Sequence, residues 1–178
     1  MKALVVYWSA TGNTQKVADA IEKGLASCST AVVKKRMADA DSEDFYDYDL
    51  VFLGSPSYEF LPPDPVIKFV KNKMKYHRGR GDVKPKAPKL PGKKAIIFVT
   101  YSGPHTGIRE AVPVGKYIGQ MLEHIGFDVT EWYVVGEFHG NERFSTLGVM
   151  GDIRGKPDDQ DLARIEQDVC ELVKSITP

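Results

Sequence analysis

The chain has 178 residues, of which 42% are hydrophobic and 27% charged, and its formal net charge is zero. This composition excludes an intrinsically disordered chain, and the length predicts a single domain over residues 1–178. The longest apolar stretches, residues 3–8 and 95–99, are far shorter than the roughly 20 residues of a membrane-spanning helix. The first stretch is also too short for a signal peptide, and no small-residue cleavage site follows it. We therefore expect a soluble, cytoplasmic protein.

Charged and thiol side chains are unevenly distributed. Residues 68–94, called the basic segment below, hold eleven Lys or Arg and one acid, so the segment carries +10 and the remainder of the chain −10. Because like charges repel one another, we expect all of these cations to face water. Cys28 and Cys170 form no metal-binding motif, and we expect both to be free thiols in helices. The four histidines are scattered, which predicts no metal site.

Five short apolar runs alternate with helical patterns, which predicts a parallel sheet with helices on both faces. The expected strands are residues 3–7, 31–34, 50–53, 95–100 and 129–135. The expected helices cover residues 14–27, a segment from Asp64 to Met74, residues 114–125, and residues 157–176. Residues 77–92 and the glycine-rich residues 139–156 fall outside this alternation. Loops of that length in a compact domain are usually functional or disordered.

The turns after the first, third and fourth strands form the candidate binding site, because open α/β sheets bind ligands beyond the carboxyl ends of their strands. Residues 9–14 form a hydroxyl-rich turn that enters a helix, where unpaired amides and the helix dipole favour a phosphate. A Walker A loop requires a lysine directly before its Ser or Thr, and Asn13 stands directly before Thr14 here. The dinucleotide motif G-x-G-x-x-G is also missing. We therefore expect a monophosphate ligand. A capped turn without a ligand would use the same residue types, and the pattern alone leaves that alternative open.

The sequence of residues 5–18, Val-Val-Tyr-Trp-Ser-Ala-Thr-Gly-Asn-Thr-Gln-Lys-Val-Ala, resembles the FMN-phosphate signature of the flavodoxin family. Residues 48–58 resemble the third strand and first flavin-ring loop of that family, and residues 100–107 occupy the position of the second ring loop. The resemblance covers nearly the whole chain. It implies a flavodoxin-like α/β three-layer sandwich, whose five-stranded parallel sheet has the order 2-1-3-4-5.

The resemblance implies that FMN binds non-covalently, with its phosphate at residues 9–14 and its isoalloxazine ring between loops 56–60 and 101–107. No catalytic residue and no metal ligand is expected. The expected cofactor-binding residues are Ser9, Ala10, Thr11, Gly12, Asn13, Thr14, Pro56, Ser57, Tyr58, Glu59, Phe60, Thr100, Tyr101, Ser102, Gly103, His105, Thr106 and Gly107.

Aromatic side chains of the ring loops suit a flat apolar ring. Tyr58, Phe60 and Tyr101 are candidates to pack against it, although loop packing alone would also explain each of them. Backbone groups of residues 57–59 and 102–105 are candidates to meet the polar edge of the ring. His105 is a candidate proton donor, with an ordinary surface histidine as the open alternative.

The resemblance implies an electron carrier between redox partner proteins. The chain departs from the family's strongly acidic electron shuttles in being neutral and in carrying the basic segment. It departs also in the glycine-rich residues 137–155 after the fifth strand, which are expected on the cofactor side, where they either cover the flavin or form a partner surface. The basic segment is either a solvated face or a surface that attracts an acidic, ferredoxin-like partner or the phosphates of NADPH.

The alternative function is an NAD(P)H-dependent FMN or quinone oxidoreductase, in which residues 139–156 and the basic segment shape a substrate pocket. A regulatory module without flavin is a third class, which the intact residues 9–14 argue against. Neither nucleic acid nor a membrane is an expected partner, because aromatic residues are sparse in the basic segment and no apolar stretch spans a bilayer.

Overall fold

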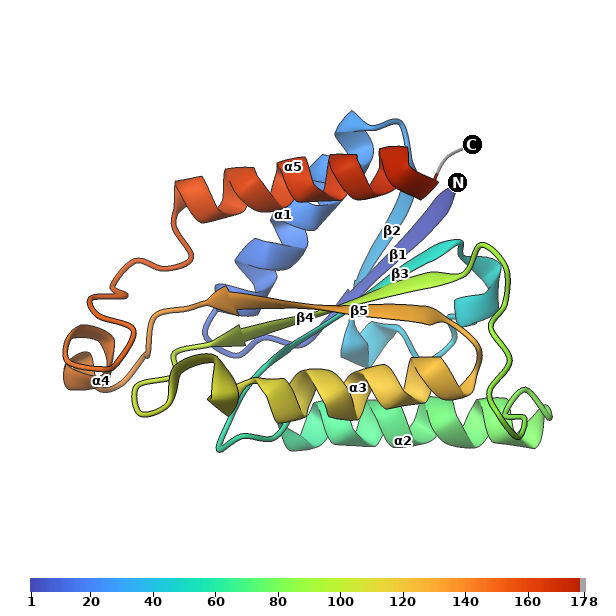
Figure 1. The fold of residues 1–178 in the computed structure, drawn as a ribbon, viewed down its shortest axis with the longest axis horizontal. Helices are drawn as coiled ribbons and strands as arrows, with labels where there is room; N and C mark the ends of the chain where they lie inside the picture. The colour runs from blue at the N-terminus through green and yellow to red at the C-terminus, as the bar shows by residue number, and fades with distance from the viewer. Residues whose placement is uncertain (177–178) are drawn as a thin grey trace.

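The computed structural model describes residues 1–176 and contains a five-stranded parallel sheet in the order β2-β1-β3-β4-β5 (Figure 1). The strands are β1 (Lys2–Tyr7), β2 (Ala31–Arg36), β3 (Leu50–Pro56), β4 (Lys94–Tyr101) and β5 (Asp128–Val135). Helices α1 (Asn13–Ser27) and α5 (Asp159–Ile176) lie on one face of the sheet, and α2 (Asp64–Gly79) and α3 (Val112–His124) lie on the other. The predicted three-layer architecture and strand order are confirmed.

Short elements complete the fold. They are the 3-10 helices η1 (Met37–Asp39), η2 (Phe45–Asp47) and η3 (Gly107–Glu110), and the five-residue helix α4 (Glu142–Thr146). Helix α5 is amphipathic, because it buries Ile165, Val169 and Val173 while acids and bases occupy its other faces. No helix within residues 1–176 has the length and apolarity that crossing a membrane requires.

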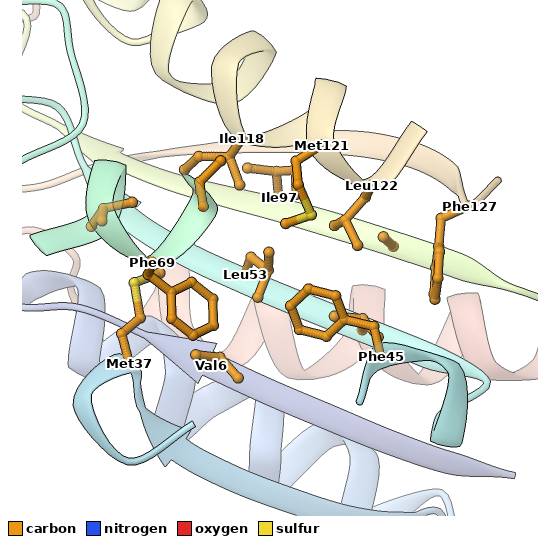
Figure 2. Close-up of a cluster of buried hydrophobic side chains, with 14 of the residues drawn as sticks. Val6, Met37, Phe45, Leu53, Phe69, Ile97, Ile118, Met121, Leu122 and Phe127 are labelled. Atoms are coloured by element: carbon orange, nitrogen blue, oxygen red, sulfur yellow. The ribbon is translucent and has the colours of Figure 1, made fainter. Parts of the chain in front are cut away.

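The strands are apolar throughout where the sheet is covered on both faces. All seven residues of β3 are buried, whereas the edge strands β2 and β5 are only half-buried. Figure 2 shows Ile118, Met121 and Leu122 of α3 beside Leu53 of β3 and Ile97 of β4. Fully burying each such side chain contributes about 1.5–3 kcal/mol. The helices are therefore held to the sheet by apolar packing on both faces.

The strand register places the carboxyl ends of the central strands together. Tyr7 of β1 pairs with Gly54 of β3, Pro56 of β3 with Thr100 of β4, and Tyr101 of β4 with Val135 of β5. The turns after these strands consequently emerge at one edge of the sheet. The turns expected to bind the cofactor therefore meet at that edge.

The expectation that every cation of the basic segment faces water is wrong for Lys73. Its side chain is 3% exposed, and its Nζ donates hydrogen bonds to the carbonyls of Asp41 (2.8 Å) and Glu43 (2.6 Å). Burial lowers the pKa of Lys73, while the carboxylates of Asp41, Asp44 and Glu43 oppose that shift. The lysine is tolerated inside because it satisfies carbonyls of the turn that connects β2 to β3.

Other cations of the basic segment bind the same acidic turn. Arg80 forms an ion pair with Asp44, and Lys93 Nζ donates to the carbonyls of Tyr46 (2.8 Å) and Tyr48 (2.7 Å). Helix α2 also continues to Gly79, so residues 77–79 belong to the helix and only residues 80–93 form the connecting loop. This loop precedes Lys94 at the amino end of β4, opposite the carboxyl-end turns.

The expectation of free thiols is also wrong, because Cys28 and Cys170 form a disulfide in the structure. The bond joins the end of α1 to α5, two helices that pack side by side on one face of the sheet (Figure 1). Cys170 lies in an expected helix, and Cys28 directly follows another. Their pairing depends on how the first and last helices pack, which neither local pattern contains.

We predict that Lys73→Met lowers the free energy of unfolding by about 2–4 kcal/mol, because two buried carbonyls lose a charged donor. Lys75→Met, at an exposed position two residues away, should change the free energy by less than about 0.5 kcal/mol. Urea unfolding of both variants measures the difference. Equal stability of the two variants would show that the Lys73 hydrogen bonds contribute nothing.

Reduction of the disulfide should destabilise the fold, because the bond closes a loop with a sequence separation of 142 residues. A loop of this size corresponds to as much as about 5 kcal/mol in the chain-entropy account. Thermal unfolding with and without dithiothreitol measures the effect, and Cys28→Ser/Cys170→Ser serves as the control that dithiothreitol should not shift. Two titratable thiols in the unfolded, unreduced protein would contradict the pairing.

Candidate functional site

A pocket of about 720 Å³ lies at the carboxyl ends of the central strands. Three of its walls are the turns after β1, β3 and β4, and the fourth is the start of the segment after β5. Every residue of the predicted cofactor-binding set lines this pocket except Gly12, Thr106 and Gly107. The structure thus brings together three turns that lie far apart in the sequence.

The turn after β1 leaves the amino terminus of α1 open. Gly12 occupies the N-cap position with φ +103°, a left-handed conformation that favours glycine, and no side chain of a described residue caps the helix. The first turn of α1 contains no acidic residue. Ser9 Oγ accepts a hydrogen bond from the Gly12 amide (3.1 Å), which fixes the bend of the turn. The amides at the start of α1 therefore remain available to an anion.

Thr14 and Asn13 connect the β1 turn to other walls. Thr14 is fully buried, and its hydroxyl lies 2.7 Å from the hydroxyl of Thr100 at the end of β4. Asn13 Nδ2 donates to the carbonyl of Glu137 (2.9 Å), and its Oδ1 lies 3.4 Å from His139 Nε2. These contacts fix the position of the β1 turn. Both side chains also line the pocket, where they offer polar groups to a ligand.

The turn after β3 exposes two aromatic side chains at the pocket mouth. Tyr58 and Leu61 exchange two backbone hydrogen bonds (3.0 and 2.9 Å), and Glu59 and Phe60 between them adopt positive φ values of 49° and 69°. This tight turn leaves Tyr58 42% and Phe60 55% exposed. Trp8 packs edge-on against Tyr58, with ring centroids 5.9 Å apart. Exposed rings held by a rigid turn are available to a planar ligand.

The turn after β4 is shaped by Glu110. Its carboxylate accepts hydrogen bonds from the backbone amides of His105 (2.9 Å) and Thr106 (2.6 Å). Those two amides are therefore already paired, and of residues 102–105 the His105 amide is the one that Glu110 occupies. Gly103 has φ +52°, and a Cβ there would lie 2.7 Å from the carbonyl oxygen of Gly107. Glycine is required for this close approach.

Residues 136–158 form an ordered excursion after β5 that builds the fourth wall. Phe138 and Phe144 pack edge-on at 5.0 Å between ring centroids, and Phe144 packs in the same way on His105 at 5.4 Å. The buried Ser145 hydroxyl bonds to the backbone of Phe138, and the Val149 amide donates to the carbonyl of Pro104 (3.0 Å). These bonds attach the excursion to the turn after β4.

The pocket is acidic. Four carboxylates line it, and of the described residues in its lining none is Lys or Arg. Burial raises the pKa values of Tyr58 and Tyr101, so both phenols are neutral at neutral pH and add no further negative charge. Tyr101 is nearly buried in the apolar core and offers less surface to a ligand than Tyr58. The carboxylates are those of Glu59, Asp64, Glu110 and Glu137.

Some lining residues were not among the individually predicted cofactor-binding residues. The turn after β3 continues along the pocket to the start of α2, and the excursion after β5 adds an aromatic wall. The placement of residues 139–156 on the cofactor side was the available signal for that wall. The added residues are Leu61, Pro62, Pro63, Asp64, Ile67, Pro104, Glu110, Glu137, Phe138, His139 and Phe144.

Comparison with known proteins places this geometry in one family. The family model described as flavodoxin matches residues 5–167. A flavodoxin of Megasphaera elsdenii is 32% identical over 99 residues, which are 54% of this chain and 63% of that protein. A flavodoxin of Clostridium beijerinckii is 27% identical over 99 residues, again 54% of this chain and 62% of the relative. The matched region therefore spans less than two thirds of either relative.

Solved structures agree in fold over the full length. Oxidised flavodoxin 1 from Bacillus cereus superimposes with a TM-score of 0.67 at 19% identity, covering 99% of this chain and 100% of that one. A flavodoxin from the domain Archaea gives 0.65 at 19% identity, with 99% of both chains covered. At such identities the likeness shows the fold, while the match of the family model over nearly the whole chain shows membership. The chain belongs to the flavodoxin family, whose members bind FMN.

Proposed function

We propose that this protein is an FMN-dependent electron carrier that exchanges electrons with redox partner proteins. The observation that carries the proposal is the uncapped amino terminus of α1, which opens into a pocket beside two exposed aromatic rings. Bound FMN would supply the one- and two-electron redox chemistry, and the chain would supply binding, orientation and electrostatic tuning.

The β1 turn fits a phosphate. The first-turn amides of α1 have no capping side chain, the dipole favours an anion there, and the hydroxyls of Ser9, Thr11 and Thr14 are close by. Thr14 and Thr100 share one hydrogen bond, which leaves one of their two hydroxyl protons for an acceptor in the pocket. No cation is needed in this arrangement, because backbone amides neutralise the anion's field.

The ring loops fit a flat apolar group. Tyr58 and Phe60 come from one side of the pocket, while Ser102, Gly103 and His105 come from the other. The two loops are already tied together, because the Ser57 amide donates to the Thr100 carbonyl (2.9 Å) and the Ser57 hydroxyl donates to the Glu110 carbonyl. A gap held open by such bonds is preorganised for a planar ligand.

The acidic lining favours an electron carrier over the NAD(P)H-dependent oxidoreductase. The phosphates of NAD(P)H would approach a mouth that carries carboxylates and no lining cation, and like charges oppose that approach. The cations of loop 80–93 do not compensate, because they lie before the amino end of β4. The eight residues of β4 separate them from the pocket by roughly 23 Å.

Electron exchange with a partner protein is therefore proposed to occur at the pocket mouth. Its surroundings are apolar: Ile108, Leu147 and Val149 are exposed next to the turns that line the pocket, together with Tyr58, Phe60 and Leu61. The acidic, ferredoxin-like partner expected from the basic segment remains a proposal. Loop 80–93 is too far from the mouth to hold such a partner against the cofactor by itself.

Removal of the Thr14 hydroxyl should weaken FMN binding roughly 10- to 150-fold, since a hydrogen bond to a charged acceptor contributes about 1.5–3 kcal/mol. Fluorescence titration of Thr14→Val measures the loss. Thr14→Ser, which keeps the hydroxyl, should retain most of the affinity. Riboflavin, which lacks the phosphate, should bind the wild type and Thr14→Val alike. Unchanged FMN affinity in Thr14→Val, or a preference for FAD, contradicts this phosphate site.

The carrier and the oxidoreductase differ in how bound FMN is reduced. We predict that anaerobic NADPH and NADH reduce the FMN-loaded protein slowly or not at all, whereas photoreduction followed by mixing with cytochrome c gives rapid oxidation of the flavin. Stopped-flow absorbance measures both reactions, with free FMN as the control. Rapid reduction by either nucleotide would replace the carrier proposal with the oxidoreductase.

A further inference from the structure

A second surface, separate from the cofactor pocket, has the properties of a docking groove. It lies between the outer faces of α2 and α3, two helices that run side by side (Figure 1), and has a volume of about 400 Å³. Its floor is made by Val70 and Met74 of α2 with Tyr117 and Met121 of α3. Val70 and Met121 are buried core residues, while Met74 and Tyr117 are half-buried and offer accessible apolar surface. Because a methionine side chain adapts to different apolar partners, this floor suits an apolar ligand surface.

The rim of the groove is positive. Lys71, Lys75 and Arg78 of α2 line it, and the exposed Lys68 continues the same row. The four α2 cations follow a spacing of three or four residues, so they form one stripe about 15 Å long on the helix surface.

The cations of this row do not contribute side-chain ion pairs or hydrogen bonds to the part of the fold that the structure describes. The side chains of Lys68, Lys71, Lys75 and Arg78 form no ion pair or hydrogen bond with any residue in positions 1–176, in contrast to Lys73, Arg80 and Lys93. The two helices contribute little negative charge of their own. Asp64 lies at the far end of α2, and Glu123 of α3 accepts a hydrogen bond from Gln120.

We infer that this groove docks an acidic amphipathic helix of a redox partner protein, an inference that rests on the proposed function. A trough between two helices fits the apolar stripe of a third helix, and the parallel row of cations fits carboxylates that flank that stripe. The groove begins at Val70, about one turn beyond Ile67, which lines the cofactor pocket. A partner anchored in the groove would therefore remain close to the mouth without covering it.

The test uses the FMN-loaded protein and a fluorescein-labelled peptide of about 14 residues, with leucines at i, i+3, i+4 and i+7 and glutamates at the flanking positions. Fluorescence anisotropy should show micromolar binding that weakens at high salt. A scrambled peptide of the same composition should bind at least about 10-fold more weakly, because it cannot present one apolar stripe.

Matched variants separate the groove from general positive charge. Lys71→Glu/Lys75→Glu/Arg78→Glu should weaken peptide binding at least about 10-fold. Met74→Gln tests the apolar floor and should weaken peptide binding at both low and high salt. Lys84→Glu/Lys86→Glu/Lys174→Glu changes the net charge equally at exposed sites outside the groove and should have little effect. FMN affinity and thermal stability, measured on each variant, show whether the pocket and fold are intact.

Three results would overturn the inference. They are equal binding of the scrambled peptide, equal loss in the two triple variants, and the absence of peptide binding by a protein that still binds FMN. Sedimentation with phosphatidylglycerol vesicles tests whether the groove binds a membrane surface instead of a protein helix. Vesicle binding that the groove variants abolish, without peptide binding, would assign the groove to lipid. Failure of the protein to bind FMN would contradict the proposed function. Peptide binding would then still show whether the groove docks an acidic helix.

Discussion

The burial of β3 on both faces is the constraint on which the rest of the structure depends. A strand without a polar face needs neighbours on both edges and helices above and below, and parallel neighbours need crossover helices to return the chain. The register that follows pairs Tyr7 with Gly54 and Pro56 with Thr100, so β1, β3 and β4 all end at one edge of the sheet. The binding site is a consequence of that register, because the turns after these strands emerge at the same edge.

The pocket walls are also bonded to one another. Thr14 joins the turn after β1 to β4, Asn13 joins it to Glu137, and the Ser102 hydroxyl donates to the Gly136 carbonyl (2.7 Å). These bonds cross between turns, so they position a polar cradle and an aromatic mouth relative to each other without a ligand. A site built in this way loses little conformational entropy when a rigid, planar cofactor binds.

The sequence was informative where the governing interactions are local. Apolar runs predicted the strands, and the hydroxyl-rich residues 9–14 predicted the turn that leaves α1 uncapped. The Cys28–Cys170 pair was missed because it depends on the packing of α1 against α5. The aromatic wall of Phe138 and Phe144 was missed in detail for a similar reason: its position depends on hydrogen bonds through Ser145 and Pro104 rather than on periodicity.

The basic segment shows why a count of charges does not describe a surface. The segment carries +10, but residues 39–49 hold six acids and pack against it. Arg80 pairs with Asp44 at the surface, while Lys73 and Lys93 donate hydrogen bonds to backbone carbonyls of the same acidic turn. Charges paired over such short distances contribute little field at the range of an approaching partner. Among residues 1–176, the side chains of Lys68, Lys71, Lys75 and Arg78 have no ion-pair or hydrogen-bond partner and form a row on α2 beside an apolar floor, while Lys84 and Lys86 project from loop 80–93. The electrostatic surface of this flavodoxin family member is therefore set by which cations the acidic turn leaves unpaired, and not by the segment's total charge.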